Sequence, residues 1–496
     1  MIAATEEVAA LARRHRVSTQ LESELAAQGV AQAIVFLDPM AGAAQGDSDL
    51  WSAELRELEG FFVKDERSMT AALLSSRTSL AAGFEGRSSS HRRGRQAGLV
   101  PRSYAEAPVM RAYPALRAVL GDVHTDGLER LTQHPTVRYV ASSLPLRLIR
   151  PVAAAAVRRP RSTTTWGIEM LEIPRLWAAG LRGRGVRVGH LDTGVDRSHL
   201  ALLKAVRDYM LTDYDGFEVP GARARDTDEH GTHTAATIAG RAVAGRYVGV
   251  APEAQLYCTT VIEGGNGTAR ILAGLDWVIR QGARIINLSL GMPGYHEDFH
   301  ELIEAVRGRG VLTVAAVGND FPGSSRSPGN YDNVLSVGAC DSALRVAEFS
   351  SSQWFARAGN PLVPDLVAPG VGVVSARSGG GYLELSGTSM ATAHITGLAA
   401  LLWGAKPSAS MTDIENAISD SCTRGGMPQD RANRGLPNGV RAYELLMGVP
   451  LAAAATGKRR AVRARSMGKI KKAGRQKAKR ARNVRRKKNA EPRKKK

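Results

Sequence analysis

The feature that most constrains the fold is an alternation of short apolar runs and amphipathic segments across residues 161–450. The runs "VRVGHLD", "RIINLSL" and "VLTVAAVGN" are rich in β-branched and other apolar residues, which is typical of buried strands. The segments "TARILAGLDWVIRQG" and "SMATAHITGLAALLW" space their apolar residues at helical intervals instead. This alternation predicts an α/β domain, a doubly wound and mostly parallel sheet with helices on both faces. We expect the functional site beyond the carboxyl ends of its strands.

Two further regions flank that domain. Residues 1–160 contain strand-like runs such as "QAIVFLDP" and "VRYVASSLPLRLI", and we expect a small α+β domain there. A Ser, Arg and Gly-rich stretch near residues 75–98 has no apolar period, which predicts a flexible insertion. Residues 451–496 form a separate basic tail.

The tail holds the whole net charge of the chain. Of the 67 Lys and Arg and 47 Asp and Glu residues, 21 basic residues and one acid, Glu491, lie in residues 456–496, and the rest balances 46 against 46. Such a run predicts disorder. Disordered polycations bind nucleic acid without sequence preference and anionic membranes, so polyanion contact competes with a solubilising or targeting role. The folded part has no net basic charge, which argues against nucleic-acid binding as its main function.

Cysteine content and the first residues bear on location. The three cysteines, Cys258, Cys340 and Cys422, are odd in number and widely spaced, which fits a reducing compartment better than a disulfide framework. The first twenty residues include two acids and no apolar run of signal-peptide length. No stretch is long enough to span a bilayer. We therefore expect a cytoplasmic, monomeric protein without a transmembrane segment.

Three reactive side chains stand where a strand ends or a helix begins. Asp192 ends the run "VRVGHLD", His230 opens a helix in "DEHGTHTAATIAG", and Ser389 lies in the first turn of "LSGTSMATAHITGLAALL". Taken singly, each has a structural interpretation as a turn former, a helix-start residue or an N-cap. His230 and His233 also have a spacing that suits a metal, but no third ligand stands at metal-site spacing.

Together the three side chains provide a nucleophile, a base and an acid that orients the base. The order Asp, His, Ser differs from the His, Asp, Ser order of chymotrypsin and from the Ser, acid, His order of α/β-hydrolases. Ser389 is also followed by Met390 and Ala391 without the second glycine of the α/β-hydrolase elbow. The order Asp, His, Ser is the one found in subtilisin.

Over most of residues 163–446 the chain resembles the subtilisin-like serine peptidases. The motifs that carry this resemblance are "LDTGVD", "HGTHTA", "GVAPEAQLY", "INLSLG", "VAAVGN", "PDLVAPG" and "SGTSMATAHITG". The resemblance implies a serine endopeptidase with Asp192, His230 and Ser389 as catalytic triad. It also implies that Asn319, in "AAVGND", donates a hydrogen bond in the oxyanion hole.

The resemblance also implies two segments that pair with the backbone of an extended polypeptide substrate. These substrate-binding residues would be Leu288, Ser289, Leu290 and Gly291 on one side, and Gly264, Gly265 and Gly267 on the other. The alternative is that they are sheet interior and turn.

This chain departs from the family pattern at two places. After "GTSMA" the family usually continues with Ser and Pro, but this chain has Thr392, Ala393 and His394. The missing proline predicts a little less local rigidity at the helix start. The segment "RAVAGRYV" is short and lacks the Asn-bearing loop that holds a structural calcium ion in many relatives. We therefore expect no cofactor, and a calcium ion would need oxygen ligands from elsewhere.

Residues 110–149 resemble, weakly, the propeptide of the family. The resemblance implies a precursor whose leading region packs on the catalytic domain, assists its folding and inhibits it by laying a strand in the cleft. Self-cleavage would then cut the linker "RPVAAAAVRRPRSTTT", between about Ala153 and Thr165. Two other hypotheses are a catalytically silent subtilisin-like binding module and a polyanion-binding protein that acts through its tail.

Overall fold

The structure, a computed structural model, describes residues 16–38, 48–63, 109–143, 146–157, 160, 162–262, 264–357 and 359–451. The predicted flexible insertion near residues 75–98 and the basic tail beyond residue 451 lie outside the described residues. Among the described residues, no helix combines the length and apolar character needed to cross a membrane.

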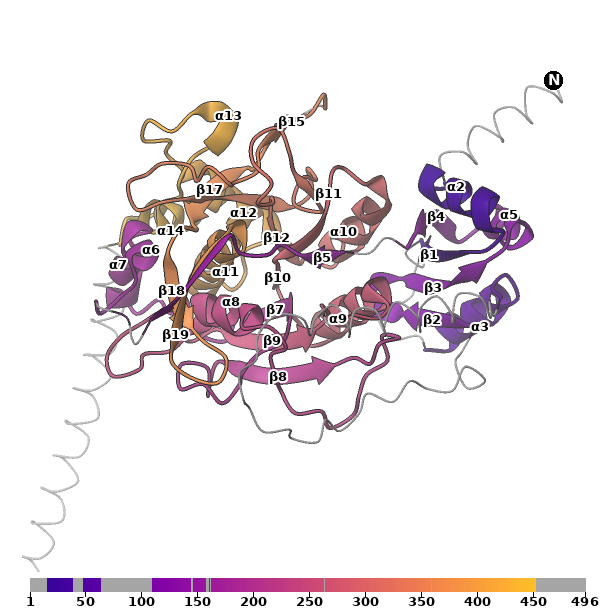
Figure 1. The fold of residues 1–496 in the computed structure, drawn as a ribbon, viewed down its shortest axis with the longest axis horizontal. Helices are drawn as coiled ribbons and strands as arrows, with labels where there is room; N and C mark the ends of the chain where they lie inside the picture. Colours follow the sequence, from indigo (N-terminus) through magenta and orange to yellow (C-terminus); the bar gives the residue numbers. More distant parts are fainter. Residues whose placement is uncertain are drawn as a thin grey trace, which may run out of the picture.

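A seven-stranded parallel sheet forms the centre of the larger domain (Figure 1). From edge to edge its strands are β17 (Leu366–Pro369), β14 (Leu335–Cys340), β12 (Leu312–Ala316), β10 (Ile285–Leu288), β7 (Arg187–Asp192), β9 (Gln255–Thr260) and β8 (Val206–Leu211). The chain adds β12, β14 and β17 on one side of β10, while β9 and β8 lie beyond β7. Every neighbouring pair is parallel. The predicted doubly wound α/β fold is therefore confirmed.

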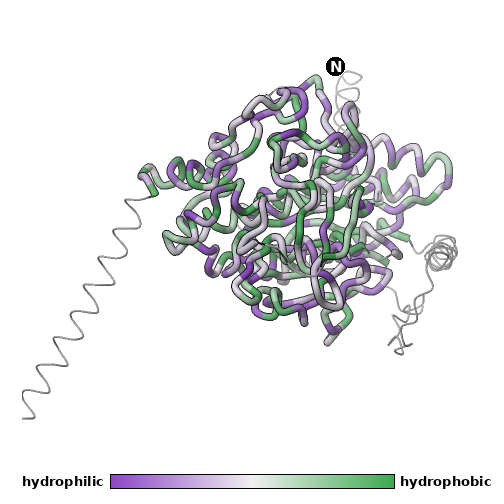
Figure 2. The backbone as a smooth tube through the Cα atoms, turned by 60° about the vertical axis from the view of Figure 1, so that its left-hand side comes forward, coloured by the Kyte–Doolittle hydropathy of each residue, from purple (hydrophilic) through white to green (hydrophobic). Residues whose placement is uncertain are grey.

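Helices cover both faces of this sheet. The main ones are α8 (His230–Ala239) and α11 (Thr388–Ala405) on one face, and α9 (Gly267–Arg280) and α10 (His300–Arg307) on the other. Successive strand residues serve opposite faces, since Ile285 packs in the core under α11 and Ile286 in the core under α9. In Figure 2 the segments in the middle of the molecule are largely green or pale, and hydrophilic segments are common on the outer loops.

The long helix α11 is buried on nearly all sides, as its continuous apolar sequence predicts. It lies between the sheet and other helices, which include α8. The remaining short elements of this domain are α6 (Trp166–Met170), α7 (Ile173–Ala178), η3 (Glu297–Phe299), β15 (Gln353–Trp354), β16 (Leu362–Val363), α12 (Met411–Asp420), α13 (Gln429–Ala432) and α14 (Gly439–Met447).

The leading region forms a separate antiparallel sheet of four strands at the other end of the molecule (Figure 1). Its order is β2 (Met110–Tyr113), β3 (Ala118–Val123), β1 (Ala31–Leu37) and β4 (Val137–Ser142), with η2 (Pro114–Leu116) between β2 and β3. Its helices are α2 (Thr19–Gln28), α3 (Ser48–Glu59) and α5 (Thr125–Gln133).

The two faces of the leading sheet have different partners. Val35 and Val119 pack in a core with residues of α2 and α5. Ile34 and Phe36, on the opposite face, belong to the core that also contains residues of α9 and α10. Among the described residues, the leading sheet thus completes its second core by packing on the larger domain.

The segment that connects the two domains forms two strands, and each pairs with a strand of the larger domain. β5 (Arg147–Leu148) pairs antiparallel with β11 (Leu290–Pro293), which also pairs with β13 (Arg326–Ser327). β6 (Ala153–Val157) pairs antiparallel with β19 (Tyr382–Ser386), which also pairs with β18 (Val373–Ala376). Residues 149–152 therefore connect β5 to β6, both of which are paired with strands of the larger domain.

Candidate active site

The four predicted catalytic residues come from the carboxyl-end edge of the parallel sheet and from two helix starts. Asp192 is the last residue of β7, and Asn319 follows β12 in the chain. His230 is the first residue of α8, and Ser389 is the second residue of α11. This edge is where an open α/β sheet binds its ligands.

Asp192 and His230 form a short and fully buried pair. The Nδ1 atom of His230 lies 2.7 Å from Oδ1 of Asp192. The backbone N–H of Thr193 donates to the same Oδ1 atom at 2.8 Å, and the Thr234 hydroxyl donates to Oδ2 at 3.2 Å. Nε2 of His230 is buried and has no hydrogen-bond partner within the described part of the chain. It is the ring nitrogen left to exchange a proton.

Each member of this pair favours the charged form of the other. Burial alone raises the pKa of Asp192, but the charge of His230 and its hydrogen bond outweigh burial, so the pKa lies below its ordinary value. Burial alone lowers the pKa of His230, but the charge of Asp192 and its hydrogen bond raise it above 6.5. A basic imidazole beside a permanent carboxylate is suited to general base catalysis.

Two residues that the sequence analysis did not single out hold the start of α8. Asp226 Oδ2 accepts the N–H of Thr232 at 2.6 Å, and the Thr193 hydroxyl accepts the N–H of Gly231 at 3.0 Å. The Thr193 hydroxyl in turn donates to Asp226 Oδ1 at 2.7 Å. These bonds satisfy free N–H groups of the first turn and so fix His230. An acid four residues before His230, in "DTDEHG", was the available signal.

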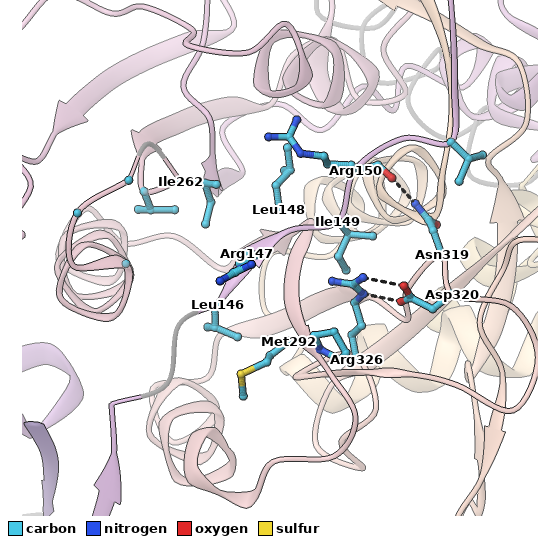
Figure 3. A pocket seen from close by; sticks show the side chains of 16 residues that line it. Leu146, Arg147, Leu148, Ile149, Arg150, Ile262, Met292, Asn319, Asp320 and Arg326 are labelled. Atoms are coloured by element: carbon cyan, nitrogen blue, oxygen red, sulfur yellow. Dashed lines mark hydrogen bonds and ion pairs between the residues drawn. The ribbon is translucent and has the colours of Figure 1, made fainter. Parts of the chain in front are cut away.

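Ser389 and Asn319 both contact the chain's own leading segment. The Ser389 hydroxyl donates to the carbonyl of Ile149 at 3.1 Å. Asn319 Nδ2 donates to the carbonyl of Arg150 at 2.9 Å, as the dashed line in Figure 3 marks. Oδ1 of Asn319 accepts both the N–H and the hydroxyl of Thr388, at 2.9 and 2.8 Å. Thr388 therefore fixes which way the amide points.

Residues 146–149 lie in the cleft as an added strand. Leu148 is paired with Leu290 and Arg147 with Gly291, and the Ile149 N–H donates to the Ser289 carbonyl at 3.1 Å.

The two residues at the site differ in burial. The Ile149 residue is only 1% exposed, whereas the Arg150 side chain is 75% exposed and pairs with Asp228 at 2.9 Å. Burial therefore holds the Ile149 side chain, and solvent surrounds that of Arg150.

The wall beside Ile149 leaves no room for a side chain at Gly291. A Cβ atom there would lie 2.8 Å from the Ser327 carbonyl oxygen and 3.2 Å from Cβ of Arg326. Arg326 pairs with Asp320, Nη2 to Oδ1 at 2.7 Å, and both side chains line the cleft (Figure 3). Glycine thus permits close approach of the strand.

On the downstream side the chain is also paired. The Val152 N–H donates to the Ser386 carbonyl at 2.9 Å, and the register of β6 with β19 runs from Ala153 opposite Ser386 to Val157 opposite Tyr382. The carbonyls at the site belong to Ile149 and Arg150, upstream of the linker cut predicted between Ala153 and Thr165.

The predicted substrate-binding residues divide into two groups. Ser289, Leu290 and Gly291 contact the leading strand as described above. Leu288 ends β10 inside the parallel sheet and is buried there, which is the alternative that the sequence left open. The second group, Gly264, Gly265 and Gly267, lines the same cleft. Within the described residues no strand pairing joins this group to the leading strand, and the predicted pairing on that side stays a prediction.

His233 does not face a shared metal position with His230. Its Nε2 atom lies 2.9 Å from the Val373 carbonyl and 3.1 Å from the Leu383 carbonyl, so it holds β18 and β19 to α8. No group of three or more His, Cys, Asp or Glu side chains converges within the described residues. Calcium also binds backbone carbonyls, so the calcium prediction stays a prediction.

Comparison with known proteins indicates the family of this chain. Residues 183–439 match the model of the subtilase family. The chain is 34% identical over 313 residues to M-protease of Shouchella clausii (strain KSM-K16), covering 62% of this chain and 74% of that protein. It is 37% identical over 264 residues to Subtilisin Savinase of Lederbergia lenta, covering 53% and 92%. It is 38% identical over 248 residues to the major intracellular serine protease of Bacillus subtilis (strain 168), covering 48% and 74%.

The chain belongs to the subtilase family. It is a serine endopeptidase, as the resemblance in its motifs implied, and a polypeptide is its class of substrate. These matches do not favour a silent binding module or a polyanion-binding protein.

This subtilase accommodates its unusual "TAH" sequence inside α11. The Thr392 hydroxyl donates to the Thr388 carbonyl at 2.9 Å, and His394 Nδ1 lies 2.8 Å from the Met390 carbonyl. Both side chains are buried. The Thr392 hydroxyl and Nδ1 of His394 thus find partners one turn back in the same helix, whereas Nε2 of His394 is buried without a hydrogen-bond partner among the described residues. The predicted loss of rigidity stays a prediction.

Proposed function

We propose that Asp192, His230 and Ser389 act as the catalytic triad of this endopeptidase, with Asn319 in the oxyanion hole, and that its first substrate is its own leading segment. One observation carries the proposal. Ser389 and Asn319 hydrogen-bond to two consecutive carbonyls, those of Ile149 and Arg150, of an uncut strand bound in the cleft.

The chemistry follows from the roles of the side chains. Ser389 Oγ attacks the carbonyl carbon while His230 Nε2 takes its proton, and Asp192 stabilises the resulting imidazolium. The carbonyl oxygen becomes an oxyanion bound by Asn319 Nδ2 and the Ser389 N–H at the start of α11. His230 then protonates the leaving nitrogen, the C–N bond breaks, and water repeats the sequence to release the acyl group.

We place the self-processing bond between Ile149 and Arg150. Three observations support Ile149 as the acyl residue: its carbonyl is the one near Ser389, its N–H pairs with Ser289, and its side chain is buried. The alternative bond, after Arg150, leads into Pro151, whose ring stands where a leaving group normally carries its N–H. Attack at Ile149 requires its carbonyl to take the Asn319 hydrogen bond that Arg150 now holds.

In this proposal the leading region inhibits the enzyme as an intramolecular segment before the cut and as a bound, separate fragment after it. Its sheet packs against α9 and α10, which ties the blocking strand to the cleft. Backbone pairing with β11 recognises any extended polypeptide, so the same cleft would serve other substrates once the strand leaves.

A fluorophosphonate probe tests the activated serine. We expect stoichiometric labelling of the mature enzyme and none of the Ser389→Ala variant. Unlabelled but folded wild-type protein would contradict the assignment.

The product of self-processing identifies the bond. Purified Ser389→Ala protein should stay full length, while wild type yields a fragment whose N-terminus is Arg150, read by mass spectrometry. An N-terminus at Pro151 would move the acyl residue to Arg150, and one between Ala153 and Thr165 would restore the linker prediction. Normal maturation of pure Ser389→Ala protein would exclude self-processing.

For the basic tail we retain nonspecific polyanion contact as the proposal. A peptide covering residues 456–496 should bind DNA at low salt and lose it at high salt, because counterion release drives such binding. Weak binding at both salt concentrations would remove the idea.

A further inference from the structure

A second buried histidine lies behind the acid of the proposed triad. His190 is on β7, two residues before Asp192, and is completely buried. Its Nε2 atom lies 2.9 Å from the hydroxyl oxygen of Thr234 and 3.7 Å from Oδ2 of Asp192. The same hydroxyl reaches Oδ2 of Asp192 at 3.2 Å. The two carboxylate oxygens are thus divided, Oδ1 toward His230 and Oδ2 toward Thr234 and His190.

The buried position decides the charge of His190. Desolvation lowers its pKa to about 4, although the Asp192 charge acts in the opposite direction. The imidazole is therefore neutral at neutral pH and carries one proton. Its strand neighbours in the sheet, Cys258 on β9 and Asn287 on β10, are buried and uncharged, since burial raises the pKa of the Cys258 thiol.

The hydrogen bonds decide which ring nitrogen carries that proton. Nδ1 of His190 is buried without a partner in the described residues, so a proton there would leave a buried donor unsatisfied. A proton on Nε2 is instead donated to the hydroxyl oxygen of Thr234. That hydroxyl can then donate its own proton to one acceptor. Three acceptors lie at 3.2 Å, namely Oδ2 of Asp192 and the carbonyls of His230 and Gly231, and the charged Oδ2 forms the strongest bond.

We infer that His190 and Thr234 are positioning residues, a fixed hydrogen-bond chain that donates to Asp192 from the side opposite His230. The chain runs from His190 Nε2–H to the Thr234 hydroxyl and from that hydroxyl to Oδ2. It stops the carboxylate from rotating and keeps Oδ1 in line with His230. The inference rests on the proposed role of Asp192 as the acid of the triad.

Substitutions at both positions test the chain in the mature enzyme. His190→Leu and Thr234→Val each remove one donor, and we expect kcat to fall about tenfold while KM changes less than about twofold. The double variant should be no more than about twofold worse than the poorer single variant, because both act through one chain. His190→Gln places an amide N–H near the position of the original imidazole Nε2, and Thr234→Ser keeps the hydroxyl. Both should recover most of the kcat that the Leu and Val variants lose.

The pH profile distinguishes positioning from packing. Without the donated hydrogen bond the Asp192 charge acts more strongly on His230, so the acid limb of kcat should move to higher pH by a few tenths of a unit. Asp226 and Asp228 also act on His230 and are unchanged in these variants. Thr237→Val is the matched control, since Thr237 is equally buried on α8 but its hydroxyl bonds to the His233 carbonyl at 2.9 Å.

To separate an effect on positioning from a loss of folded enzyme, kcat is expressed per fluorophosphonate-labelled site and folding is verified by thermal unfolding. An unmoved acid limb, fully multiplicative losses, or an equal effect of Thr237→Val would overturn the inference. If Asp192→Asn keeps full activity, the proposed triad itself is wrong, whatever the His190 variants do.

Discussion

The two domains of this subtilase bury their sheets in different ways. The parallel sheet of the catalytic domain has its own helices on both faces, with α8 and α11 on one side and α9 and α10 on the other. The leading sheet covers one face with its own helices and leaves the other to α9 and α10. Undocking would expose to water the apolar face that packs on α9 and α10, and would so remove part of the stabilisation of the leading sheet. In our proposal the leading domain is therefore the part that separates after self-processing.

The largest expected effect tests whether the chemistry belongs to the catalytic domain alone. Asp192→Asn should lower kcat on the order of 10⁴ and slow self-processing by the same factor, because in our proposal one site performs both reactions. Loss of the Asp192 charge also removes the main cause that raises the pKa of His230. Activity is lost as pH falls through that pKa, so the acid limb of the residual activity should move to lower pH. Stopped-flow kinetics with a peptide substrate over pH 5 to 9 measures both. A limb that stays in place would contradict the pairing.

The next prediction concerns the core that the leading sheet shares with α9 and α10. Phe36→Ala removes a fully buried ring from the face that packs on the catalytic domain, at a cost of about 3 to 5 kcal/mol. The inhibition constant of the separated leading region, added to mature enzyme, should rise by about 10² or more. Glu129→Ala, at an exposed position of α5, is the control and should leave inhibition unchanged. Equal inhibition by the Phe36 variant would mean that the leading domain does not depend on this face.

A smaller effect is expected at the contact between the leading strand and Asn319, the proposed oxyanion-hole residue. Asn319→Ala removes the hydrogen bond to Arg150 and should lower kcat by about 10² to 10³, with a smaller change in KM. Thr388→Val should reproduce part of this loss, since the Thr388 hydroxyl orients the Asn319 amide. An Asn319 variant with unchanged kcat but weaker inhibition by the leading region would assign Asn319 to binding only.

The smallest effect concerns the pH dependence of docking. Asp276 on α9 accepts the Ala115 N–H of the leading domain at 2.7 Å. Burial raises its pKa, despite the opposing charge of Arg280. We expect burial by the leading domain to hold this pKa higher in the docked state than in the free enzyme, although the Ala115 hydrogen bond opposes the rise, so inhibition should strengthen a few-fold as pH falls through that pKa. Asp276→Asn in the mature enzyme should flatten this dependence, and the inhibition constant as a function of pH measures it.

The elements that could be predicted from sequence are those whose signals are local. β7, β10 and β12 follow from their apolar runs, and α9 and α11 from helical spacing. Asp192, His230, Asn319 and Ser389 stand at ends of such elements, and the structure places them along one edge of the sheet. The pairing predicted for Gly264, Gly265 and Gly267 stays a prediction, because strand pairing needs a partner backbone at the right distance, which composition does not specify.

The sequence by itself determined the family, the α/β class and the candidate residues, because strand ends and helix starts carry short patterns that need no distant partner. Only the tertiary structure decided that Ile149 and Arg150, rather than residues of the later linker, lie at Ser389, since that register depends on two pairings far apart in the chain. The same holds for His190 and Thr234. They lie 44 positions apart, and only the packing of α8 against β7 brings both to one carboxylate.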